Sequence, residues 1–283
     1  MICIRSILAL RLHIDKEKQH SRSIGFVPTM GALHEGHISL IKQAKNENAV
    51  CIASIFVNPL QFNNVDDFNK YPIQHEADIL MMEQAGCDIL FMPDVQEFYP
   101  IKPKISIDMG ALDRILEGAH RPGHFSGVAI VVTKLFHAVS PTKAYFGQKD
   151  LQQVAVINQL VRELNFPIQV VSCPIIRESN GLAMSSRNMR LTEQGRLLAS
   201  NLFIALSHIK EAIIQGEQQV EKAQNVGKDY LKKLIGIELE YLEIVNSTTL
   251  EPLSSINTKE GIAICIAAHI EGVRLIDNVV IIS

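Results

Sequence analysis

One apolar run, Val50–Val57, constrains the fold of this chain more than any other segment. It shows no alternation of polar and apolar side chains, so a strand formed there must be buried on both faces, as in a parallel sheet. Apolar runs at 23–27 and 88–92 flank it, and helical patterns begin near His37 and near Gln74. This βαβαβ rhythm predicts an α/β fold built on a Rossmann-like parallel sheet.

The remaining pattern predicts a different unit after Pro174. Before this proline, strands are expected at 105–107, 143–146 and 168–173, and helices at 126–139 and 150–164. After it, helices are expected at 192–215 and 220–234, and strands near 237–245, 261–269 and 273–281. Helices and strands are segregated there, which indicates an α+β arrangement. We therefore expect a Rossmann-like nucleotide- and substrate-binding domain over residues 1–176 and a smaller α+β lid domain over residues 177–283.

Composition limits the classes of function. The chain has 283 residues, of which 47% are hydrophobic and 20% charged, and its net charge is −3, which is typical of a globular protein. This charge gives no electrostatic support for binding nucleic acid or an anionic membrane. The five cysteines are scattered and are expected to be reduced. We find no signal peptide and no apolar run of membrane-spanning length, so we expect a cytoplasmic protein.

The strongest chemical signal is the segment Pro28–His37, which follows a predicted strand and opens a helix. It puts His34 and His37 at a helix N-terminus, where backbone N–H groups and the helix dipole favour an anion such as phosphate. Two other interpretations remain open at this point: the histidines cap the helix, or they bind zinc. The zinc pattern is incomplete, because residue Ile38 stands where a second histidine ligand would be needed.

Two further polar segments follow predicted strands. Asn58 and Gln61 come directly after the apolar run, and Lys149, Asp150 and Gln153 come after the strand at 143–146. Open parallel sheets bind ligands outside the carboxyl ends of their strands, so these side chains are expected at one edge of the sheet. Lys149 offers a point charge for phosphate. Alternatives remain open: Asn58 is also consistent with a turn former, Asp150 with a helix N-cap, and Lys149 with a solvated surface charge.

A fourth segment, Gly181–Asn188, lies beyond the expected domain boundary. Its Ser185, Ser186 and Arg187 supply two hydroxyls and a guanidinium, which together are suited to neutralising a departing pyrophosphate. By itself this sequence is also consistent with an ordinary loop.

Together these segments resemble the pantothenate synthetase family, the pantoate–β-alanine ligases, within the adenylyl-transferring superfamily that carries HIGH-type and KMSKS-type signatures. The resemblance runs from about Pro28 to Asn278 and includes a fitting tail at Arg274–Asn278. Its motifs are Pro28–His37, Phe56–Phe62, Arg121–Phe125, Phe146–Asp150 and Gly181–Asn188. The first 25 residues match poorly, and Asn180 and His137 differ from the residues usual there.

The resemblance implies a ligase that condenses (R)-pantoate with β-alanine to pantothenate through a pantoyl adenylate, with release of AMP and pyrophosphate. His37, His34 and Lys149 would be catalytic. The substrates would be held by Gln61, Gln153 and Asn58. ATP would be bound by Met30, Gly31, Ala32, Leu33, His34, Glu35, Gly36, His37, Gly147, Gln148, Lys149, Asp150, Ile176, Met184, Ser185, Ser186 and Arg187.

The resemblance also implies that Mg²⁺ arrives with ATP, and that the protein is a homodimer, which the apolar segment 126–139 favours. Asp78 is a candidate to approach the metal, but a lone aspartate on a predicted helix is expected at the surface, so no protein ligand is assigned. Two rival functions stay open. One is another adenylyltransferase, such as a tRNA ligase, which the length and net charge disfavour. The other is a non-catalytic nucleotide- or zinc-binding module.

Overall fold

The structure, a computed structural model, describes residues 1–63, 68, 69 and 71–281. The chain forms two compact units. Unit 1 consists of Met1–Gly147 and Val156–Cys173, and unit 2 consists of Gln148–Ala155 and Pro174–Ser283. The segment 148–155 thus belongs with the later part of the chain, although the sequence pattern assigned it to the first domain. The domain boundary expected at Ile176 stays a proposal.

Unit 1 is built on a six-stranded parallel sheet with the strand order β1-β4-β3-β2-β5-β6. Its strands are β1 (Ile2–Ile4), β2 (Ile24–Thr29), β3 (Val50–Ile55), β4 (Ile89–Phe91), β5 (Lys143–Gly147) and β6 (Gln169–Cys173). The predicted Rossmann-like parallel sheet is confirmed. From β2 the chain proceeds through β3 to β4 on one side and later places β5 on the other side. The strand order therefore reverses between β2 and β5, where open α/β sheets bind ligands.

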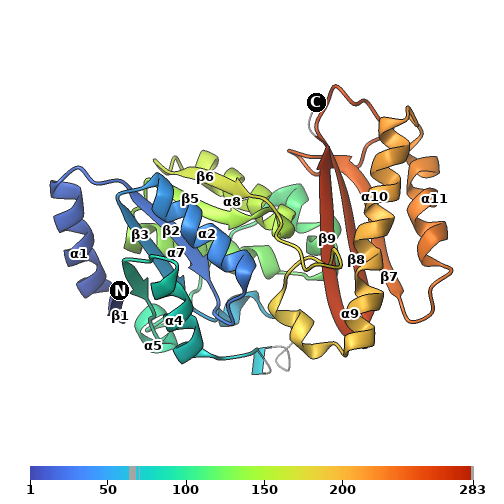
Figure 1. Cartoon of the computed structure of the whole chain (residues 1–283). Helices are drawn as coiled ribbons and strands as arrows, with labels where there is room; N and C mark the ends of the chain where they lie inside the picture. Colours follow the sequence, from blue (N-terminus) through green and yellow to red (C-terminus); the bar gives the residue numbers. More distant parts are fainter. Residues whose placement is uncertain (64–67, 70, 282–283) are drawn as a thin grey trace. The chain divides into compact units, whose positions relative to one another are not determined.

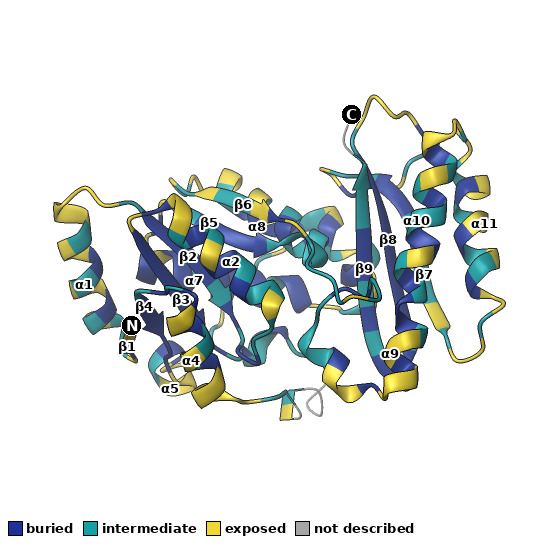
Figure 2. Cartoon of the chain, viewed as in Figure 1, coloured by how far each residue is buried: buried dark blue, intermediate teal, exposed yellow. Residues whose placement is uncertain are grey.

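The apolar run of β3 is buried along its whole length, as its sequence requires (Figure 2). On one face, Cys51, Ala53 and Ile55 pack with Ile41 and Ala44 of the preceding helix in a single apolar cluster. The alternate residues of the strand are buried as well. Burial of both faces explains why this strand shows no polar alternation.

The helices of unit 1 connect these strands (Figure 1). They are α1 (Ile7–Gln19), α2 (Glu35–Glu47), η1 (Pro59–Gln61), α4 (His75–Gln84), α5 (Val95–Phe98), η2 (Gly110–Asp113), α6 (Leu116–His120), α7 (His124–Val139) and α8 (Leu151–Glu163), whose first turn belongs to unit 2. Two expectations need correction. The strand predicted at 105–107 does not form, because the Ile107 N–H donates to the Ser126 hydroxyl instead of to a neighbouring strand. The apolar helix α7 is largely buried inside unit 1, so its composition needs no partner subunit.

Unit 2 combines a three-stranded antiparallel sheet, ordered β7-β8-β9, with helices. Its elements are η3 (Gln148–Asp150), η4 (Ser186–Arg190), α9 (Glu193–Ala199), α10 (Asn201–Ile214), α11 (Val220–Leu231), β7 (Glu238–Asn246), β8 (Ile262–Ile270) and β9 (Val273–Ile281). The helices α10 and α11 lie side by side against the sheet (Figure 1). The expected α+β architecture is confirmed. The single helix predicted at 192–215 is divided at Ser200, whose hydroxyl donates back to the Leu197 carbonyl.

The segment Glu193–Ile214 is long and apolar enough to cross a membrane by length and composition alone. By that measure alone, the segment departs from the expectation that no apolar run approaches membrane-spanning length. Its side chains Leu202, Leu206, Ile209 and Ile213 are buried in the core of unit 2 with side chains of the sheet. Packing of a core helix accounts for its apolar composition.

We predict that Gly127→Ala destabilises the protein, although alanine normally favours a helix interior by about 1 kcal/mol. A Cβ atom at Gly127 would collide with the Leu60 carbonyl oxygen of η1, so α7 and η1 would have to separate. We expect the free energy of unfolding, measured by urea denaturation, to fall by about 1–3 kcal/mol. Thr133→Val on the same helix is the control, since the Thr133 hydroxyl has no hydrogen-bond partner among the described residues. A Gly127→Ala protein as stable as this control would contradict the packing argument.

Candidate functional site

The turn after β2 is held by a buried carboxylate from α4. Gly31 and Ala32 both adopt positive φ, at 81° and 51°, which costs energy for the alanine. Asp78 accepts hydrogen bonds from the backbone N–H groups of Ala32 at 2.9 Å and Leu33 at 2.8 Å. Only 1% of Asp78 is exposed, so the expectation that it lies at the surface is wrong. Its charge is satisfied by backbone donors, and the turn is fixed in return.

His34 and His37 cap the start of α2. The Gly36 N–H donates to His34 Nδ1 at 3.1 Å, and the His34 N–H donates to His37 Nδ1 at 3.4 Å, so the two residues form a reciprocal capping box. Because Nδ1 of each ring accepts a hydrogen bond, each neutral imidazole carries its own hydrogen on Nε2. The capping interpretation is confirmed, and its hydrogen bonds use Nδ1 of each ring. The protonated Nε2 is chemically suited to donate to an anion.

The zinc interpretation finds no support at this turn. Among the residues that the structure describes, no group of three or more histidine, cysteine, aspartate or glutamate side chains is arranged to hold a metal ion. Both carboxylate oxygens of Asp78 accept from backbone N–H groups. His34 itself lies one residue before α2 rather than on a shared helical face with His37.

Gln61 reaches the same turn from η1. Its side-chain amide donates to the Met30 sulfur at 2.9 Å, so the structure brings together residues from the ends of β2 and β3, as predicted. Gln61 is 9% exposed, and the thioether sulfur is only a weak acceptor. A polar substrate group would be a better partner for this amide.

Asn58, by contrast, has all its polar atoms engaged inside unit 1. Its Oδ1 accepts from the Tyr99 hydroxyl at 3.0 Å and from the Leu60 N–H at 3.3 Å. Its Nδ2 donates to Gln61 Oε1 at 3.1 Å and to the Gly127 carbonyl at 3.1 Å. Burial raises the pKa of the Tyr99 phenol, which keeps this donor protonated. The arrangement suits Asn58 to orienting Gln61 rather than to touching a ligand.

His124 is a second residue that supports Gln61. Its Nδ1 lies 2.8 Å from the Gln61 backbone carbonyl, an acceptor, so Nδ1 carries the proton. The side chain is 6% exposed at the start of α7. Sequence reasoning gave His124 no role, although it lies in one of the motifs quoted above.

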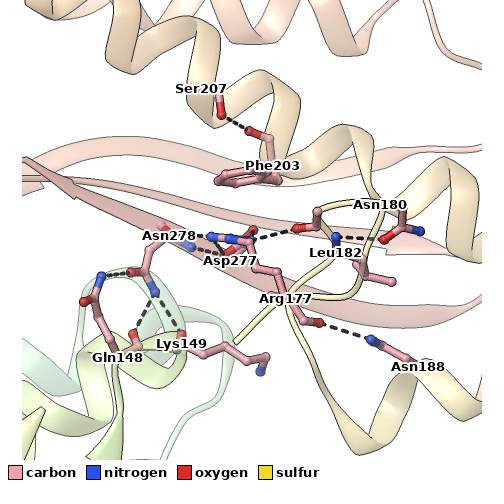
Figure 3. Close-up of polar contacts among 12 residues, drawn as sticks. Gln148, Lys149, Arg177, Asn180, Leu182, Asn188, Phe203, Ser207, Asp277 and Asn278 are labelled. Carbon is pink, nitrogen blue, oxygen red and sulfur yellow. Dashed lines mark hydrogen bonds and ion pairs between the residues drawn. The ribbon is translucent and has the colours of Figure 1, made fainter. Parts of the chain in front are cut away.

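In unit 2, the turn Gln148–Asp150 carries the predicted lysine. Lys149 Nζ lies 3.5 Å from Asp150 Oδ1, a long and weak ion pair, and the lysine side chain is 18% exposed. The backbone carbonyls of Gln148 and Lys149 each accept a 2.9 Å hydrogen bond from Asn278 Nδ2 of β9 (Figure 3). Gln153 follows in the first turn of α8, while Gly147 ends β5 in unit 1.

The predicted residues Ile176 and Met184 meet in a short hairpin of unit 2. The Met184 N–H donates to the Ile176 carbonyl at 3.0 Å, and Arg177 pairs with Ala183 in an antiparallel bridge. Ser185 then caps η4, its hydroxyl accepting from the Arg187 N–H at 3.2 Å. The hairpin thus leads directly into the hydrogen-bonded turn that carries Ser185, Ser186 and Arg187.

A buried ion pair anchors this hairpin to β9. Arg177 donates two hydrogen bonds to Asp277, at 2.6 and 3.0 Å, and its guanidinium carbon lies 3.7 Å from the centre of the Phe203 ring (Figure 3). Burial raises the pKa of Asp277, and the Arg177 guanidinium counteracts that rise. Neither residue was predicted as functional, although Asp277 belongs to the tail motif.

The site residues predicted from the sequence therefore fall in both units. Unit 1 holds Asn58, Gln61, Gly147 and the turn from Met30 to His37. Unit 2 holds Gln148, Lys149, Asp150, Gln153, Ile176, Met184, Ser185, Ser186 and Arg187. Within unit 1 the structure brings Gln61 into contact with Met30, and within unit 2 it brings Met184 into contact with Ile176.

Comparisons with known proteins agree along the whole chain. A sequence model of the family described as "Pantoate-beta-alanine ligase" matches residues 2–280. The chain is 67% identical over 282 residues to the pantothenate synthetase of Cytophaga hutchinsonii, covering 100% of both chains. The crystal structure of pantothenate synthetase from Thermus thermophilus is similar with a TM-score of 0.93 and 41% identity, covering 100% of both chains.

A second solved structure adds information about ligands. The pantoate-beta-alanine ligase from Francisella tularensis, complexed with beta-gamma ATP and beta-alanine, is similar to this chain with a TM-score of 0.78 and 38% identity. The match covers 99% of this chain and 97% of that one.

We predict that Asp78→Asn loosens the turn after β2. The amide would present its own N–H group to one of the two backbone N–H groups that the carboxylate now accepts. We expect the free energy of unfolding to fall by about 1–3 kcal/mol, measured by urea denaturation. Glu76→Gln, an exposed change of the same kind on α4, is the matched control and should change stability little. Equal stability of the two variants would show that Asp78 does not hold the turn.

Proposed function

The chain belongs to the pantoate–β-alanine ligase family, and on this basis we propose that it condenses (R)-pantoate with β-alanine to form pantothenate at the expense of ATP. The reaction passes through a pantoyl adenylate and releases AMP and pyrophosphate. The observation that carries the proposal is the capped helix start at His34 and His37, which puts the ring hydrogen of each neutral histidine on Nε2, as a donor suited to an anion. It stands in a chain that matches the family from end to end.

In the first step, a pantoate carboxylate oxygen bonds to the α-phosphorus of ATP, and the bond from that phosphorus to pyrophosphate breaks. Negative charge grows on the phosphoryl oxygens and on the leaving group, so stabilising this charge is the main catalytic need. His34 and His37 donate from Nε2 in the proposed mechanism, and Lys149 supplies a positive charge. Ser185, Ser186 and Arg187 are proposed to hold the leaving pyrophosphate.

In the second step, the neutral amine of β-alanine attacks the carbonyl carbon of the adenylate, loses a proton and expels AMP. The step requires no covalent bond to the protein. When the adenylate and β-alanine are held in contact, their proximity and orientation supply much of the acceleration of this step. Gln61 and Gln153 are proposed to bind pantoate, because amides pair with both hydroxyls and carboxylates without adding charge.

The structure refines the proposed role of three residues. Asn58 was expected to bind substrate, and we propose that it acts through Gln61, to which it donates. The N–H groups of Ala32 and Leu33 donate to Asp78, so these two residues are proposed to shape the ATP-binding turn rather than to donate to phosphate. The other residues predicted to contact ATP keep that proposed role.

Mg²⁺ is proposed to enter with ATP, held by phosphate oxygens. Within the described ranges no cluster of acidic or histidine side chains forms a cage for it. A homodimer is a proposal from the family resemblance, and a cytoplasmic location is a proposal from the scattered cysteines and the absence of a signal-peptide pattern in the sequence. The homodimer is no longer favoured by α7, whose apolar residues are used inside unit 1.

The decisive test is exchange of labelled pyrophosphate into ATP, which requires reversible adenylate formation. We expect exchange that depends on pantoate, and we expect His37→Ala to reduce it by at least about 100-fold, since one lost donor to transition-state charge has that effect. His75→Ala, an exposed histidine of unit 1, serves as the control. Exchange that depends on another carboxylic acid would identify a different adenylyltransferase. Absence of exchange with every acid tested would indicate a non-catalytic module.

We predict that Lys149→Ala impairs adenylate formation more than the second step. The ammonium group is proposed to stabilise charge on the phosphates, which no longer include pyrophosphate once the adenylate has formed. Pyrophosphate exchange should fall by about 100-fold, while turnover of added pantoyl adenylate with β-alanine should fall far less. Lys233→Ala, an exposed lysine of unit 2, is the control. Equal losses in both assays would rule out this role for Lys149.

A further inference from the structure

The tail motif Arg274–Asn278 has no role in the proposed reaction, yet its last two residues are among the most buried polar side chains of unit 2. Asp277 is 5% exposed and Asn278 is 3% exposed. Both lie on β9, where successive side chains point to opposite faces of the sheet. A buried polar side chain must find hydrogen-bond partners inside the protein, so the partners of each residue show which segment it holds.

Asn278 holds the turn that carries Lys149. Its Nδ2 donates one hydrogen bond to the Gln148 carbonyl and one to the Lys149 carbonyl, both at 2.9 Å. Its Oδ1 accepts from Gln148 Nε2 at 3.3 Å. Figure 3 shows these three contacts converging on the Asn278 amide from η3. Both amide hydrogens and the amide oxygen are therefore used on this one turn.

Asp277 holds a different segment from the neighbouring position. Its carboxylate receives two hydrogen bonds from Arg177, which also donates to the Gly181 carbonyl at 3.1 Å. Arg177 belongs to the hairpin that leads into Ser185 and Arg187. Two adjacent residues of one strand thus anchor the two segments of unit 2 that are proposed to contact ATP.

We propose that Asn278 is a positioning residue that sets the place of the Lys149 ammonium for adenylate formation. The inference rests on the proposed function of Lys149. A lysine side chain has a flexible four-carbon stem, so its charge is confined only if the backbone that carries it is fixed. Asparagine suits this task, because its amide offers two donors in one plane to two successive carbonyls, which aspartate cannot do when ionised.

The test compares pantoate-dependent pyrophosphate exchange in Asn278→Ala, Lys149→Ala and the double variant. Asn278→Ala should lower kcat at least about 10-fold while the KM for pantoate changes less than about 3-fold. If Asn278 acts through Lys149, the double variant should lie within about 3-fold of Lys149→Ala alone. Losses that multiply, or a single variant with wild-type exchange, would overturn the proposal.

Asn246→Ala is the matched control for a merely structural weakening of unit 2. Its Oδ1 accepts from the N–H groups of Thr248 and Thr249 at the end of β7, so the change removes a turn contact without affecting η3. We expect its exchange activity to stay near that of the wild type. Asn278→Leu is made in parallel, because it preserves the volume of the side chain, removes both donors and buries no charge against the two carbonyls.

Hydrogen exchange of the peptide spanning residues 146–153 separates this proposal from the proposed function. In Asn278→Ala and Asn278→Leu the amides of this peptide should exchange at least about 10-fold faster than in the wild type and in Asn246→Ala. Unchanged exchange would overturn the positioning role whatever the activity. If the wild type instead shows no pantoate-dependent pyrophosphate exchange, the proposed function fails, and the hydrogen-exchange result still decides whether Asn278 holds the turn.

Discussion

The buried carboxylate of Asp78 is the contact on which the turn after β2, and the candidate site in unit 1, depends. It accepts from two successive backbone N–H groups and so stabilises a turn in which a non-glycine residue has positive φ. The start of α2, and with it the histidine pair, follows directly from this turn. Asn58 and Asn278 act by the same principle elsewhere, since each is a buried short polar side chain that binds backbone near a residue proposed to contact substrate. Such contacts fix a loop at the cost of burying a polar group, which full hydrogen bonding offsets.

The histidine pair shows that a structural role and a chemical role need not compete. An imidazole has two nitrogens that point in different directions, and here the δ nitrogens are occupied by the helix start. That occupation fixes the tautomer, so the ε nitrogens carry the protons. The ring centres lie 4.1 Å apart, which would oppose two positive charges. The cap therefore leaves Nε2 of each ring as the nitrogen that carries the hydrogen suited to a phosphate oxygen.

Much of the fold follows from local patterns in the sequence. The run at β3 has no polar face, so its burial in a parallel sheet could be predicted, and the ends of β2 and β5 could be recognised as candidate sites of chemistry. Asp78 could not be placed, because nothing local distinguishes a buried carboxylate on α4 from an exposed one. The assignment of residues 148–155 to unit 2 was also missed, since it depends on contacts with β9. The strand predicted at 105–107 does not form for a related reason. A strand needs a neighbouring strand to pair with, and a short apolar segment in the sequence does not show whether one is present.

The attachment of η3 to β9 makes unit 2 discontinuous in the sequence. The chain passes from one unit to the other after Gly147, after Ala155 and after Cys173. The contact between Gln148 and Asn278 spans 130 residues, and closing a loop of that length costs roughly 4 kcal/mol of chain entropy. We expect this closure to follow the formation of the local β8–β9 hairpin during folding. The turn that carries Lys149 would then be among the last parts of the chain to reach its native position. A folding chain would therefore form most of its secondary structure before Lys149 is placed for catalysis.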